Sequence, residues 1–200
     1  MYTELLIETM QRSLIGYFFV IPLLILYFLF LKEKGKKQPK AHIVISFIFC
    51  YYLIGILTMT GIGKNLGFSP RFEGIDFQNI TSEIILNVLL FLPLGIFLPL
   101  MYESFNTMKK VFLTAFFVSL SVELFQMFGR GTTSINDLIT NILGACLGYF
   151  IFKVIRKYYK RSFYSQKVND GLEVLFYWVV CFIIMISIQP IIISYLFKLG

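Results

Sequence analysis

Six long apolar runs constrain what this 200-residue chain can fold into more than any other feature. A helix that crosses a bilayer needs about 20 mostly apolar residues. The composition agrees, because 58% of the residues are hydrophobic and only 14% are charged, against about 25% in a typical soluble protein. We therefore predict an all-α, polytopic membrane bundle of about six transmembrane helices, over residues 14–31, 41–62, 84–102, 110–128, 135–153 and 172–197.

The basic residues predict the orientation of these helices. Of the 18 Lys and Arg residues, 13 lie in three connecting segments, residues 32–40, 103–110 and 153–171. Because cytoplasmic loops carry an excess of Lys and Arg, we expect these segments in the cytoplasm and both termini outside. A net charge of +7 could also indicate nucleic acid. Basic residues confined to short loops between apolar runs instead indicate that the partner is the lipid bilayer and not a nucleic acid.

The same pattern suggests three parts. Residues 1–40 form an N-terminal transmembrane helix and a basic cytoplasmic loop, and residues 41–155 form a four-helix membrane core. Residues 156–200 form a basic cytoplasmic segment and a C-terminal transmembrane helix. The first apolar run exceeds the roughly 7–15 residues of a signal-peptide core, so we interpret it as a transmembrane helix.

Polar residues that are energetically unfavourable in a bilayer occur where the fourth and fifth runs meet across a short turn. A charged side chain in the bilayer core costs roughly 2.5–3.5 kcal/mol on insertion scales, so such residues are functional candidates. Glu123, Gln126 and Arg130 are spaced i, i+3, i+7 and share one helix face. They indicate either a polar site open to the outer surface or a structural network in which Glu123 bonds to Asn141 or Arg130.

The fifth run adds further polar groups at a similar depth. Ser134 and Asp137 have the spacing of a capping box, so Asp137 either caps the helix or contacts a ligand. Asn141 lies one turn further on the same face, and Asn87 enters the third run from the same side. We predict a ligand-binding cluster in the outer half of the membrane, with Glu123 and Asp137 as catalytic candidates. Its members are Asn87, Glu123, Gln126, Arg130, Asp137 and Asn141.

Three further features bear on this cluster. Gly144 and Gly148 form a GxxxG pair, which predicts close helix packing but does not by itself indicate a dimer. The loop over residues 63–83 is long enough to lie over the cluster, either as a connection with aromatic interface anchors or as a lid. His42 is the only histidine, and we expect it at the cytoplasmic interface. A histidine triad or histidine-based metal site is therefore excluded from the cluster, and we expect no metal and no cofactor.

Taken together, the motifs of three helices resemble those of the VanZ-like family. The shared set is Asn87-x3-Phe91-x-Pro93-Leu94-Gly95, Ser121-x-Glu123-x2-Gln126, Arg130, and Asp137-x3-Asn141-x2-Gly144-x3-Gly148. The resemblance covers about residues 40–155 and leaves the first and last helices outside. Many members carry another acidic residue before the Asp, where this chain has Ser134 and Asn136. A role that needs two adjacent carboxylates is therefore not expected.

The resemblance implies a multi-pass protein of the bacterial cell membrane and no established reaction. The family is named for an accessory protein of glycopeptide resistance that lowers sensitivity to teicoplanin. Three functions stay open: a pocket that binds a lipoglycopeptide or a lipid-linked cell-wall precursor, an intramembrane enzyme, and a small-molecule transporter. In the pocket, Arg130 would bind an anion, whereas in the enzyme Glu123 would be the general base or nucleophile.

Overall fold

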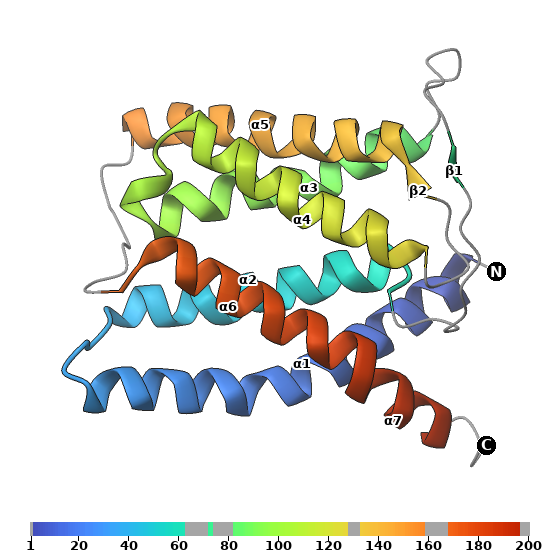
Figure 1. Cartoon of the computed structure of the whole chain (residues 1–200), viewed down its shortest axis with the longest axis horizontal. Helices are drawn as coiled ribbons and strands as arrows, with labels where there is room; N and C mark the ends of the chain where they lie inside the picture. Colours follow the sequence, from blue (N-terminus) through green and yellow to red (C-terminus); the bar gives the residue numbers. More distant parts are fainter. Residues whose placement is uncertain (1, 63–71, 74–81, 128–132, 159–167, 197–200) are drawn as a thin grey trace. The chain divides into compact units, whose positions relative to one another are not determined.

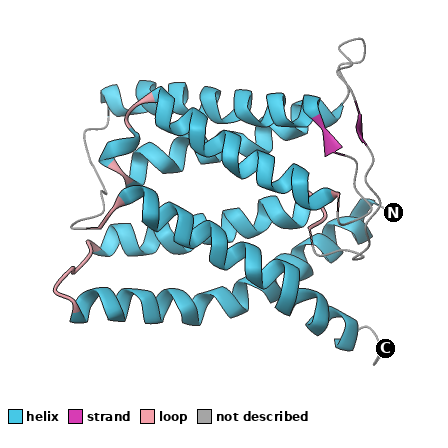
Figure 2. Ribbon diagram, viewed as in Figure 1, coloured by secondary structure: helices cyan, strands magenta, loops and turns pink. Residues whose placement is uncertain are grey.

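The computed structural model describes residues 2–62, 72–73, 82–127, 133–158 and 168–196. Nearly all of these residues are helical, which confirms the predicted all-α bundle, and the rest form short turns and one pair of two-residue strands (Figure 2). The chain forms two compact units. The first unit is Met1–Leu66 with Gln166–Gly200, and the second unit is Gly67–Ser165.

The first unit contains α1 (Tyr2–Glu33), α2 (Lys40–Met59) and α6 (Asp170–Ile183), which continues through a π-helical segment, η2 (Ile184–Ile188), into α7 (Gln189–Leu196) (Figure 1). Both α1 and α2 end in a Schellman motif. Lys36 donates its backbone N–H to Leu31 O at 2.8 Å, and Ile62 donates to Leu57 O at 3.0 Å. Gly35 and Gly61 occupy the left-handed positions, with φ of 70° and 77°, because glycine has no Cβ to oppose that conformation.

The second unit contains α3 (Ser82–Met101), a short 3₁₀ turn η1 (Glu103–Phe105), α4 (Met108–Gln126) and α5 (Ile135–Tyr158). Its two strands are β1 (Phe72–Glu73) and β2 (Thr133–Ser134), which pair in parallel. Within this unit α3, α4 and α5 lie side by side, as Figure 1 shows. Before α3 begins at Ser82, the described part of the long 63–83 loop is β1, and its pairing with β2 brings this loop to the segment that precedes α5.

Glycines bring α3 and α5 into backbone contact. A Cβ built on Gly144 would lie 2.3 Å from Val88 O, and one on Gly148 would lie 2.0 Å from Leu92 O. On α3, a Cβ on Gly95 would lie 1.8 Å from Ala145 O. Because residues 88 and 92 meet residues 144 and 148 in order, the two helices run parallel. No larger residue fits these three positions without movement of a helix backbone.

In the described part of the chain, five helices are long and apolar enough to cross a membrane: Thr9–Glu33, Lys40–Met59, Ile84–Met101, Ile135–Tyr158 and Asp170–Tyr195. They correspond to five of the six predicted runs. The remaining run forms α4, a helix of 19 residues that carries Lys109, Lys110 and Glu123. The contacts also divide the chain differently from the three predicted parts, because α2 packs against α1 and α6 and belongs to the first unit.

Candidate functional site

Glu123 is a buried carboxylate of the second unit, with a relative exposure of 3%. Its Oε2 accepts the backbone N–H of Ser134 at 2.9 Å. Its backbone carbonyl accepts the hydroxyl of Thr133 at 3.0 Å. Both bonds cross from α4 to β2, so Glu123 holds the entrance to α5 against the last turns of α4. In the described residues, Glu123 hydrogen-bonds to Ser134 and Thr133 and not to Asn141, one of the two partners that the sequence offered.

Asp137 lies in the first turn of α5 and connects this helix to α3. Its Oδ1 accepts an N–H of the Asn87 side chain at 2.8 Å. Its backbone N–H reaches Ser134 Oγ at 3.4 Å, which is half of the predicted capping box. The N–H of Ser134, which a full capping box would give to Asp137, goes to Glu123 instead. The Asp137 carboxylate is therefore used for an interhelical contact with Asn87.

Asn141 lies one turn deeper than Asp137 and is buried. Its side-chain amide donates to Ser119 Oγ on α4 at 2.9 Å. Its Oδ1 is also buried and has no hydrogen-bond partner among the described residues. A buried carbonyl oxygen without a donor loses the hydrogen bonds that it made to water, so this atom is an available acceptor.

These contacts define the polar cluster: Asn87, Ser119, Glu123, Ser134, Asp137 and Asn141. It joins α3, α4 and α5 at one end of the second unit. Of the other predicted site residues, Gln126 is half-buried and is the last residue of α4. Arg130 lies outside the described residues.

The long loop reaches the edge of the polar cluster. Phe72 pairs with Thr133 and Glu73 pairs with Ser134 in the parallel ladder. Ser134 is therefore held on two sides, by the backbone of β1 and by the Glu123 carboxylate. Whether the loop closes as a lid stays a prediction, because its other residues lie outside the described ones.

The polar cluster combines carboxylates with amides and hydroxyls, groups that bind ligands through hydrogen bonds. Across the described residues, no three His, Cys, Asp or Glu side chains lie where they could hold a metal ion together. The chemistry available at the described positions is therefore that of two carboxylates, Glu123 and Asp137, with neighbouring amides. Such a set can accept hydrogen bonds from hydroxyl or ammonium groups.

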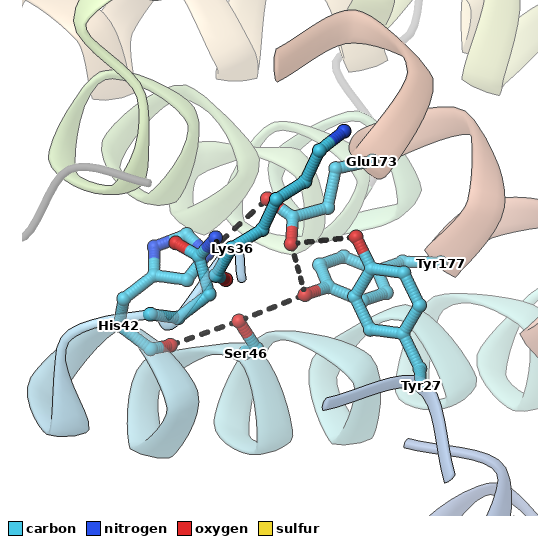
Figure 3. A network of polar contacts seen from close by, with 7 residues as sticks. Tyr27, Lys36, His42, Ser46, Glu173 and Tyr177 are labelled. Carbon is cyan, nitrogen blue, oxygen red and sulfur yellow. Dashed lines mark hydrogen bonds and ion pairs between the residues drawn. The ribbon is translucent and has the colours of Figure 1, made fainter. Parts of the chain in front are cut away.

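A second polar network, which the sequence analysis missed, lies in the first unit (Figure 3). His42 Nε2 lies 3.2 Å from Glu173 Oε2, and both side chains are fully buried. The hydroxyls of Tyr27 and Tyr177 both donate to Glu173 Oε1 at 3.0 Å. Ser46 then links Tyr177 to the backbone carbonyl of His42. The network connects α1, α2 and α6.

The expected position of His42 at the cytoplasmic interface stays a prediction, and the structure adds that its side chain is enclosed by protein. Its side chain is 0% exposed, because it is enclosed at the start of α2 and faces the carboxylate of α6. A signal for this contact was present in the sequence. Glu173 is a lone carboxylate inside the predicted run 172–197, and an acidic residue there requires a partner.

Apolar helices of membrane-spanning length, joined by buried polar side chains, define a multi-pass integral membrane protein of the helical-bundle class. The chain belongs to the VanZ/LLP1 family, whose model matches residues 15–156. This match begins inside α1, so the first helix is part of the shared region, contrary to the expectation from the motifs.

A named relative agrees with this assignment. The chain is 30% identical over 96 residues to "Protein VanZ" of Enterococcus faecium. The alignment covers 48% of this chain and 56% of the Enterococcus protein, so the chain spans about half the length of that relative. No solved structure matches the chain.

Proposed function

We propose that this protein resides in the bacterial cell membrane and lowers sensitivity to lipoglycopeptides such as teicoplanin. In this proposal the polar cluster lies in the outer half of the membrane and binds a lipid-like or drug ligand. The ligand is either the drug itself or the lipid-linked cell-wall precursor on which the drug acts. Membership of the VanZ/LLP1 family supports the resistance phenotype, and the basic loops support the orientation.

The observation that carries the site is the convergence of α3, α4 and α5 on buried and half-buried polar groups. Asn87 meets Asp137, Glu123 meets Ser134, and Asn141 meets Ser119. Polar side chains inside the membrane are functional candidates by default. Each one costs free energy that an apolar side chain at the same position would not cost. The unpartnered Oδ1 of Asn141 supports a ligand that carries hydrogen-bond donors.

Binding agrees with the geometry better than catalysis does. An acid or base must reach the atom whose proton it moves, within about 2.6–3.2 Å. Glu123 is 3% exposed, and its Oε2 is occupied by the Ser134 amide. The carboxylate therefore acts first as a positioning residue for the start of α5. An enzyme that modifies an outer-leaflet lipid is the second candidate, and it requires a substrate to reach the other carboxylate oxygen, Oε1, of this buried side chain.

The test is direct binding of teicoplanin to the purified protein in lipid nanodiscs, with vancomycin and empty nanodiscs as comparisons. We expect saturable binding of teicoplanin that is weakened by Asp137→Ala and Asn87→Ala. Binding that equals that of empty nanodiscs would contradict a drug pocket. In that case the same variants would be titrated with lipid-linked cell-wall precursor, and absence of binding there would reject the ligand pocket altogether.

A further inference from the structure

The end of the second unit opposite to the polar cluster carries a concentrated positive charge. The first turn of α4 contributes Lys109 and Lys110, and the last turns of α5 contribute Lys153, Arg156 and Lys157. The four lysines are exposed and Arg156 is half-buried. Glu103 of η1 is the acidic residue of the connecting turn. We call these five cations the basic face.

Asn106 holds the two halves of the basic face together. Its backbone carbonyl accepts the hydroxyl of Tyr149 at 2.7 Å. Its side-chain oxygen accepts a hydrogen bond from the Arg156 guanidinium. Because Lys109 and Lys110 follow Asn106 by three and four residues, these bonds fix the start of α4 beside the end of α5.

Aromatic rings orient the cations of α5. The Lys153 ammonium lies 5.3 Å from the ring centre of Tyr149, and the Arg156 guanidinium lies 5.8 Å from that of Phe152. Cation–π contacts at these distances restrain the charged groups without neutralising them. The basic face is therefore a preorganised array of charges, set between apolar helix surfaces and the helix ends.

We propose that the basic face is a binding surface for anionic phospholipid headgroups of the inner leaflet. Clusters of four to eight Lys and Arg next to a membrane helix attract anionic headgroups strongly. Exposed apolar side chains of α5, Ile151, Val154 and Ile155, provide a surface for the acyl chains directly beside the cations. This combination of apolar surface and restrained cations fits a lipid better than a soluble anion or a nucleic acid.

The experiment measures the lipids retained by the full-length protein after purification from membranes that contain phosphatidylcholine and phosphatidylglycerol. Native mass spectrometry gives the ratio of the two bound lipids relative to the bulk ratio. We expect phosphatidylglycerol to be enriched about threefold or more on the wild type. The variant K109Q/K110Q/K153Q/K157Q should return the ratio to that of the bulk lipid.

Two matched variants control this result. K32Q/K34Q/K36Q/K37Q removes four exposed lysines from the last turn of α1 and the α1–α2 connection, and it should keep most of the enrichment. K109R/K110R/K153R/K157R preserves the charge and should also keep it. The proposal is overturned if K109Q/K110Q/K153Q/K157Q retains the enrichment or if the α1–α2 variant abolishes it equally. It is also overturned if added inorganic phosphate displaces the lipid from the wild type.

Discussion

His42 and Glu173, which are 131 positions apart, meet at 3.2 Å with both side chains fully buried. The contact joins the start of α2 to the first turn of α6. Tyr27 and Tyr177 complete the hydrogen bonding of the same carboxylate. A buried pair of this kind tolerates the loss of one partner poorly, because the other is left without compensation in an apolar environment.

Glu173→Ala should therefore destabilise the protein by about 3–5 kcal/mol. The measurement is unfolding of the purified protein in detergent micelles, monitored by circular dichroism. Glu33→Ala is the matched control, because Glu33 is an exposed carboxylate at the end of α1. Equal stability of the two variants would show that the network does not hold α6 in place.

Tyr177→Phe should cost more stability than Tyr27→Phe. Tyr177 is buried and its hydroxyl contacts both Glu173 and Ser46, whereas the half-buried Tyr27 contacts Glu173. Hydrogen bonds to charged groups contribute about 1.5–3 kcal/mol each. When Glu173 is already Ala, Tyr27→Phe should become nearly neutral and Tyr177→Phe should keep only the smaller cost of its lost contact with Ser46, which double-mutant cycles would measure. Additive effects would argue against a shared network.

Gly148→Ala should destabilise the second unit, because the new Cβ would lie 2.0 Å from the backbone oxygen of Leu92. Overpacking of this type costs about 1–3 kcal/mol. Gly55→Ala is the control within α2, since a Cβ there meets no atom within 4 Å. Gly55→Ala should be neutral or stabilising by up to about 1 kcal/mol. The measurement is the thermal unfolding midpoint of each variant. Equal midpoints for Gly148→Ala and Gly55→Ala would contradict the close packing of α3 against α5.

Glu123→Gln and Glu123→Ala should differ in stability. Gln keeps an oxygen that can accept the Ser134 N–H, whereas Ala leaves that buried N–H without its present acceptor. An unsatisfied buried donor costs about 1–3 kcal/mol. We expect near-normal stability for Glu123→Gln and a lower unfolding midpoint for Glu123→Ala. If Glu123→Ala were as stable as the wild type, the positioning role of Glu123 would be wrong.

Local and periodic features of the fold were predictable from the sequence. Apolar runs predicted the helices, because length and composition suffice for a membrane-spanning segment. The three-residue spacing of Ser134 and Asp137 predicted the cap, since both atoms of that bond belong to one turn. The GxxxG spacing predicted close packing for Gly144 and Gly148, and the structure gives α3 as the partner helix.

The choice of partners between helices was not predictable in the same way. Periodicity identifies the face on which Glu123 lies, but not that its acceptor oxygen meets the backbone of Ser134. The pairing of Phe72 with Thr133 depends on the path of a long loop, which leaves no periodic signal. The His42–Glu173 contact depends on which helices of the first unit are neighbours, and that is set by packing of whole faces.

The most direct measurement is the susceptibility of a Gram-positive host that lacks this gene to teicoplanin and vancomycin. The strains would carry wild type, Glu123→Gln, Arg130→Ala, Asp137→Asn or the control Glu33→Gln at matched membrane abundance. We predict that wild type and Glu33→Gln protect against teicoplanin, and that Asp137→Asn and Arg130→Ala lose most of the protection. Protection by Glu123→Gln would favour binding, and its loss together with a modified lipid would favour an enzyme. Equal protection by all the variants, or none by the wild type, would contradict the central claim.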